Sequence, residues 1–199
     1  MANVKPNHTV TGKVRLSYAH LLEPHKNPLD DENAKPKYSV QLLIPKSDRA
    51  TKAKIDAAIK AACENALETG KLKKGTPIDR LPNPVHDGDG YKSDGYTEYG
   101  PEAKGCWVLA ASSLDKPKIV DLNRDVIIDP LEIYSGMYAR VGLDFYVYSN
   151  RKVGVGCGLG NIQKVADGDP LGGSRVSVDD DFDDGYEDGA DWYDYDPLE

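Results

Sequence analysis

Side chains alternate strictly between two faces in the segment from Thr9 to Tyr18. One face carries the basic residues Lys13 and Arg15, and the other carries Val10, Gly12, Val14, Leu16 and Tyr18. A period of two is typical of a β-strand with one buried face. The pattern therefore predicts a strand with a basic outer face and with Tyr18 on its inner face.

An apolar run over 38–44, ended by a proline, predicts a second strand. Residues 47–69 then have the period of an amphipathic helix. Ser47 or Asp48 suits the N-cap, and Gly70 suits the position after the last turn. The apolar stripe of this helix consists of Ile55, Ala58, Ile59, Ala62, Cys63, Ala66 and Leu67.

Residues 71–104 are rich in glycine, proline and aspartate and show no clear period. A connection this long inside a compact domain is usually functional or disordered. Beyond it, three short apolar segments predict strands at 106–111, 118–122 and around 126–128.

The strongest alternation lies in two consecutive segments, Met137 to Tyr148 and Val153 to Val165, joined by a turn at 149–151. The first segment has an apolar face that predicts core positions, namely Met137, Ala139, Val141, Leu143, Phe145 and Val147. The second points valine, cysteine and leucine inward and glycine outward from 153 to 160. The two segments predict a long β-hairpin.

About six short strands with one helix inserted among them indicate a mostly-β fold. The best single match is a five-stranded Greek-key barrel of the OB type. We expect this domain to span residues 1–175 and a disordered acidic tail to span residues 176–199.

The outer face of the predicted hairpin carries three aromatic side chains and a base where solubility requires none: Tyr138, Arg140, Tyr146 and Tyr148. Aromatic rings that stack on bases, with Lys and Arg along the phosphates, are how proteins hold single-stranded nucleic acid without reading its sequence. The outward glycines of the next strand would leave a shallow trough beside these rings. In the alternative interpretation the tyrosines only cover those glycines, which is a packing device of sheets.

Other basic and aromatic residues are candidates for the same nucleic-acid surface, although each alone is also explained as a solvated charge or, for Trp107, as a core anchor. They are Lys13, Arg15, Lys37, Tyr91, Tyr96, Trp107, Arg151 and Lys152. The tyrosines of the long connection would close over a bound strand or belong to a surface excursion, and both interpretations stay open.

Charge is divided unevenly along the chain, whose formal net charge is −8. Residues 1–175 hold 22 acidic and 25 basic side chains, a net of +3, whereas residues 176–199 hold 11 acids and no base. A basic body with an acidic tail is a pattern of nucleic-acid-binding proteins. The tail also carries aromatic side chains that a merely solubilising segment would lack, and we expect it to bind partners through Asp181, Phe182, Trp192, Tyr193 and Tyr195.

Several other classes of protein are disfavoured. No apolar run reaches the roughly 18 residues of a membrane span, and no signal-peptide pattern is present. The three cysteines form no C-x-x-C pair, which argues against a disulfide scaffold or a zinc site and for a reducing compartment. The glycines at 154–160 fail the dinucleotide pattern because Leu159 stands where glycine is required. Asp87 and Asp89 form the only cluster suited to a divalent metal, and turn chemistry explains them better.

The chain resembles a family of bacteriophage single-stranded DNA-binding proteins built on an OB fold. The resemblance rests mainly on the segments 134–140, 145–148, 158–165 and 167–171, with weaker likeness at 87–89 and 110–113. It implies a non-enzymatic protein of the bacterial host cytoplasm, without cofactor or metal, that coats single-stranded DNA during phage DNA replication, recombination or repair. It also implies that the acidic tail recruits replication or recombination proteins. The tail departs from the family pattern because it ends in Asp-Pro-Leu-Glu rather than in phenylalanine.

Two alternatives remain beside this function. In the first, the chain is a protein-interaction module whose acidic tail imitates DNA and occupies a DNA-binding partner. In the second, Asp87 and Asp89 hold the metal of a nuclease. The sequence sets no oligomeric state.

Overall fold

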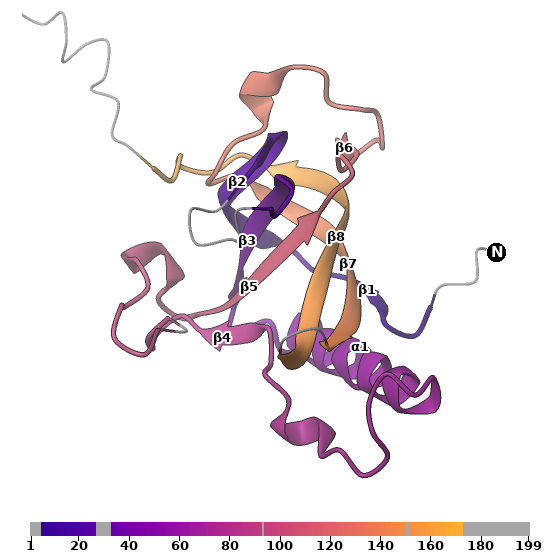
Figure 1. Cartoon of the computed structure of the whole chain (residues 1–199). Coiled ribbons are helices and arrows are strands. Elements are labelled where there is room, and N and C mark those ends of the chain that lie inside the picture. The colour runs from indigo at the N-terminus through magenta and orange to yellow at the C-terminus, as the bar shows by residue number, and fades with distance from the viewer. Residues whose placement is uncertain (1–4, 27–32, 93, 150–151, 173–199) are drawn as a thin grey trace, which may run out of the picture.

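The computed structural model describes residues 5–26, 33–92, 94–149 and 152–172 (Figure 1). Its helix is α1 (Arg49–Glu68), and its strands are β1 (His8–Val10), β2 (Val14–His25), β3 (Lys37–Pro45), β4 (Val85–Asp87), β5 (Cys106–Ser113), β6 (Ile119–Val120), β7 (Tyr138–Ser149) and β8 (Val153–Ala166). Single turns of 3-10 helix lie at Ile78–Arg80, Pro101–Ala103 and Pro130–Glu132.

Five strands form a ring in the order β2–β3–β5–β8–β7 and back to β2. All contacts in the ring are antiparallel except the parallel one between β5 and β8, which pairs Ser112 with Gly158. The ring closes where Val14 and Arg15 of β2 pair with β7. This order confirms the OB-type barrel.

The core lies inside the barrel and consists largely of the inward-facing side chains of the alternating segments. The six apolar positions predicted to point inward, namely Met137 just before β7 and five within β7, are all buried. Helix α1 packs across the lower end of the barrel and adds Ile55, Ala58 and Ala62 to the same core (Figure 1). Its N-cap is Asp48, whose carboxylate accepts a hydrogen bond from the Thr51 amide at 3.0 Å, and Gly70 comes just after the helix with a φ of +74°.

The first predicted strand is interrupted and longer than expected. The Thr11 side chain, between β1 and β2, is buried, and its hydroxyl accepts a hydrogen bond from the Val141 amide of β7 at 3.0 Å. Strand β2 then continues to His25, beyond the predicted end at Tyr18. The inward placement of Tyr18 was wrong, because the pairing of β2 with β3 shifts between Ser17 and His20 and turns Tyr18 outward.

The long connection over residues 71–104 contains a strand that the sequence did not reveal. Strand β4 pairs with β5 over three residues and extends that side of the barrel. Conversely, the strand predicted at 118–122 shrinks to β6, and the one around 126–128 is a single bridge between Val126 and Val120.

Candidate nucleic-acid interface

A groove of about 520 Å³ lies on the outer face of β3 and β5. One wall is the end of β2, and the other is the segment around residues 92–102. The side chains that give the groove its chemistry are Tyr18, His20, His25, Gln41, Lys92 and Tyr99. The groove thus combines rings, an ammonium group and an amide on one concave surface.

Tyr18 reaches this groove because of an irregular backbone. Its φ is +47°, which a non-glycine residue rarely adopts, and its side chain is 60% exposed. The irregularity coincides with the register shift of β2. Bulges often turn a side chain toward a functional site, and local strain persists where function requires it.

Two histidines stack on each other at the same wall. The ring centroids of His20 and His25 are 4.3 Å apart, with 14° between the ring planes. Burial, and then the neighbouring His25, lower the pKa of His20. Both rings line the groove, so their charge state sets part of its potential.

A network of ion pairs holds the base of the second wall. The Lys46 ammonium donates to Asp87 at 2.5 Å and to Asp89 at 2.7 Å, and the Gly105 amide donates to Asp89 at 2.9 Å. Hydrogen bonds to Lys46 lower the pKa of both carboxyl groups. The amide of Asp89 also donates to the Asp87 carboxylate, so turn chemistry describes this segment. Among the residues that the structure describes, no group of three or more potential metal ligands occurs.

A short hairpin projects from this wall and carries two of the predicted tyrosines. Tyr91 bridges to Glu98, and the Lys92 amide donates to the Thr97 carbonyl at 2.7 Å. Tyr91 is 58% exposed and Tyr96 is 78% exposed, so both rings present open faces beside the groove. Lys37 is exposed at the opposite end, paired in register with His25.

Lys13, Arg15 and Tyr138 form a separate cluster at the start of β7, at the start of β2 and just before β2. The Lys13 ammonium lies 4.5 Å and the Arg15 guanidinium 5.9 Å from the centre of the Tyr138 ring. Arg15 also donates to the carbonyls of Asp169 (2.7 Å) and Gly136 (3.3 Å). Arg15 therefore fastens the last described segment to the barrel.

The remaining predicted residues of β7 lie outside the groove. Arg140 is exposed and donates weakly to Gln163 at 3.5 Å. Tyr146 and Tyr148 are exposed as predicted, but their rings lie across Gly156 and Gly154, so the predicted trough is already filled. Lys152 is exposed at the start of β8.

Trp107 is partly buried and packs against the main core, as the core-anchor alternative had it. The ammonium groups of Lys46 and Lys52 lie 5.0 and 5.2 Å from its ring centre. Arg151 and the five predicted tail residues lie outside the described residues.

A protein-family model for the ssDNA-binding protein of Enterobacter phage Enc34 matches residues 7–192 of the chain. The chain belongs to this family. A curated relative, "Putative protein p50" of Acyrthosiphon pisum secondary endosymbiont phage 1, is 31% identical over 175 residues, which cover 86% of this chain and 90% of the relative. The family is one of DNA-binding proteins rather than of enzymes.

Solved structures of the same family share the fold. The single-stranded DNA-binding protein of bacteriophage Enc34 in complex with ssDNA is 28% identical, with a TM-score of 0.67 over 86% of this chain and 97% of that chain. A second structure of the Enc34 protein matches with a TM-score of 0.64 over 92% of this chain and 97% of that chain. Bacteriophage T7 gp2.5, a single-stranded DNA-binding protein, is 17% identical with a TM-score of 0.55, and shows the fold alone.

The predicted site residues lie on different surfaces of the barrel. In the ring of strands, β7 is separated from β3 by β2 on one side and by β8 and β5 on the other. Lys37, Tyr91 and Tyr96 flank the groove, whereas the tyrosines of β7 do not. The residues that line the groove were not predicted, because alternation placed Tyr18 on the inner face and no pattern marked His20 or His25. No described helix is long and apolar enough to cross a membrane.

Proposed function

We propose that this phage protein binds single-stranded DNA in the groove on β3 and β5 without reading its sequence. The observation that carries the proposal is the outward turn of Tyr18, at a strained φ, into a groove that also holds stacked histidines and Lys92. In OB folds this face of the barrel is where oligonucleotides bind. The family relative solved in complex with ssDNA supports the proposal.

The chemistry of the groove suits a single strand. Tyr18, Tyr91 and Tyr96 expose ring faces on which bases stack, and every base has such a face. Lys37 and Lys92 then contact phosphates. Stacking with charge contacts discriminates little between bases, so the binding is independent of sequence.

The proposed biological role is to coat single-stranded DNA during phage replication, recombination or repair, in the cytoplasm of the bacterial host. The tail over 176–199, with 11 acids and interleaved aromatic residues, would regulate access to the groove and recruit replication or recombination proteins. The composition of the tail also favours a second candidate function. A chain of acids and rings imitates DNA, and would occupy a DNA-binding partner.

Replacing Tyr18 with alanine tests the groove. We expect the affinity for a labelled oligo-dT to fall roughly 5- to 150-fold, the loss of one stacked base. Fluorescence anisotropy at fixed salt measures the effect. The backbone strain at position 18 is present with either side chain, so stability changes little.

The matched control is Ile128→Ala, which truncates a side chain that is 89% exposed and does not line the groove. It should bind oligo-dT as the wild type does. Equal affinities for wild type, Tyr18→Ala and a Tyr91→Ala/Tyr96→Ala variant would refute the groove as the DNA site.

The stacked histidines predict that DNA affinity rises as pH falls. A phosphate beside His20 favours its imidazolium form, so the complex takes up a proton that the free protein lacks. Because burial and His25 hold the pKa of His20 below its usual 6.5 in the free protein, the gain appears on acidification from about pH 7.5 to pH 5.5. The other charged or titratable side chains lining the groove are His86, Lys92, Glu102, Tyr18 and Tyr99.

A pH series of oligo-dT affinities checks this prediction. The variant His20→Gln/His25→Gln should flatten the pH profile. A profile that stays unchanged in the double variant would assign the titration to another group.

A further inference from the structure

Two tyrosine rings lie side by side on the outer face of β7, away from the groove. Tyr146 is 49% and Tyr148 is 40% exposed. A Cβ atom added to Gly156 would lie 2.6 Å from Cζ of Tyr146, and one added to Gly154 would lie 2.7 Å from Cζ of Tyr148. Each ring therefore packs across the backbone of β8 and is held in place, while its remaining surface is open to solvent.

The rings are spaced for an extended strand. They are two residues apart on β7, so their Cα atoms are about 7 Å apart. Stacked bases in a duplex rise by roughly 3.4 Å. Bases that stack one on each ring are consequently pulled apart from each other, which a single strand permits and a duplex does not.

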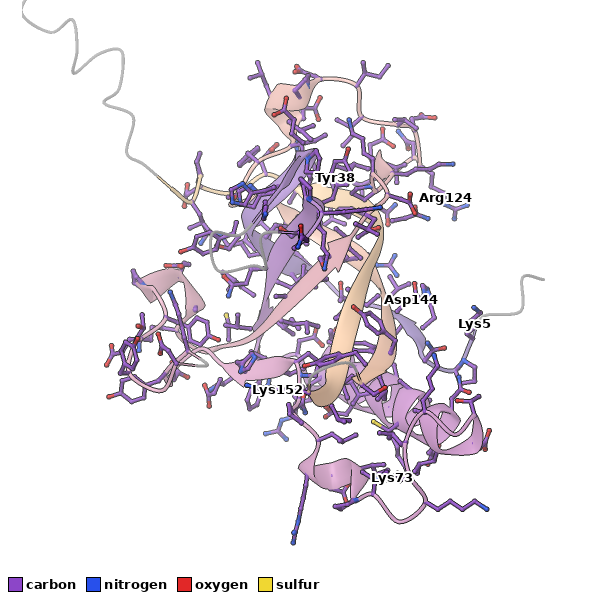
Figure 2. All side chains as sticks on the ribbon, viewed as in Figure 1. Lys5, Tyr38, Lys73, Arg124, Asp144 and Lys152 are labelled. Carbon is purple, nitrogen blue, oxygen red and sulfur yellow. The ribbon has the colours of Figure 1, made fainter. Side chains whose placement is uncertain are left out.

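Two lysines lie near the rings, and an acidic group marks one limit of the surface. Lys71 lines a hollow of about 170 Å³ with Tyr146, between β7 and the end of α1. Lys152 is exposed just after the β7–β8 turn (Figure 2). On the other side, Asp144 is 3.0 Å from His8 and marks the end of a surface that phosphates would approach.

This surface is joined to the groove through β4. His86 of β4 lines the groove, and β4 pairs with β5. A few residues earlier, the carbonyl of Pro82 accepts a hydrogen bond from the Val155 amide of β8 at 3.2 Å. Val155 follows Gly154, and the ring of Tyr148 covers Gly154. A DNA strand that leaves the groove along β4 would therefore reach the two tyrosines next.

We propose that Tyr146 and Tyr148 form a second contact surface for single-stranded DNA, so that a long strand passes from the groove around β4 onto β7. The proposal rests on the proposed function of the groove and extends it. In this arrangement the single-stranded DNA wraps partly around the barrel. It also gives these tyrosines a role that covering Gly154 and Gly156 does not require.

The dependence of affinity on oligonucleotide length tests the proposal. In Tyr146→Leu/Tyr148→Leu the glycines remain covered, but the aromatic faces are lost. For the shortest oligo-dT that the wild type binds, we expect an unchanged affinity. For oligo-dT of about 30 to 40 nucleotides, we expect a loss of roughly 30-fold or more, as for two stacked bases. Tyr146→Phe/Tyr148→Phe keeps the ring faces and should bind every length as the wild type does.

The outcomes separate this inference from the proposed function. An equal loss at every length would place the tyrosines in the primary site and overturn the second surface. Unchanged affinity at every length would assign the rings to covering glycines alone and would also overturn it. If the wild-type protein binds no oligo-dT of any length, the proposed function itself fails, and this inference with it.

Discussion

Replacing Gly136 with alanine is expected to lower the free energy of unfolding by about 3 to 5 kcal/mol, a large part of the stability of a typical domain. Gly136 has a φ of +118°, and an added Cβ would collide with the carbonyl oxygen of Asp169. The obstacle is backbone, which no rotamer change relieves. The segments 134–140 and 167–171, both part of the family resemblance, meet at this contact, and the Leu171 amide donates to the Ser135 carbonyl at 2.7 Å. Urea or thermal unfolding measures the loss, a drop in melting temperature of roughly 10 °C.

Gly172 supplies the matched control, because its φ of +113° is nearly the same and nothing lies within 4 Å of an added Cβ. Gly172→Ala therefore introduces the backbone strain without the collision, and should lower the free energy of unfolding by about 1 kcal/mol. Equal losses of stability in the two variants would show that backbone strain alone, and not the contact with Asp169, explains the need for glycine at position 136.

The sequence predicted those elements in which a long pattern has one buried face. Strand β7 spans twelve residues, and a slip of one position would have moved Phe145 out of the core. The same holds for α1, whose stripe, N-cap and Gly70 all agree. Strand β4, with three residues, carries too little pattern to be recognised.

The site was predicted less well than the fold, for two physical reasons. A register shift leaves alternation intact in the sequence but rotates the residues that come after the shift, so Tyr18 moved from the core face to the groove. The order of strands around the barrel is also absent from a linear pattern. Tyr146 and Tyr91 therefore looked like parts of one surface, although β7 and the 91–98 hairpin face different sides.

Ending the chain at Arg175 is expected to strengthen binding to oligo-dT on the order of 10-fold at about 20 mM salt. The truncation changes the formal net charge from −8 to +3. It removes an anionic segment with aromatic side chains, which we propose competes with DNA for the groove. At about 300 mM salt the difference should shrink, because added ions screen the tail as they screen the phosphates. Anisotropy titrations of both chains across a salt series measure it, and the truncated chain should show the steeper slope of log affinity against log salt.

A third chain, with every Asp and Glu of 176–199 changed to Asn or Gln, keeps the length and the aromatic residues of the tail while removing its charge. If charge alone causes the competition, this chain binds DNA as the truncated one does, and if the rings contribute, its affinity lies between the other two. Loss of oligo-dT binding on truncation would contradict the competing tail and place the DNA contacts within it. If neither chain binds oligo-dT even at low salt, and the tail alone binds a DNA-binding protein, the DNA-mimic function is correct instead. The groove then needs another ligand, because Tyr18 would still stand at a strained φ with its ring exposed.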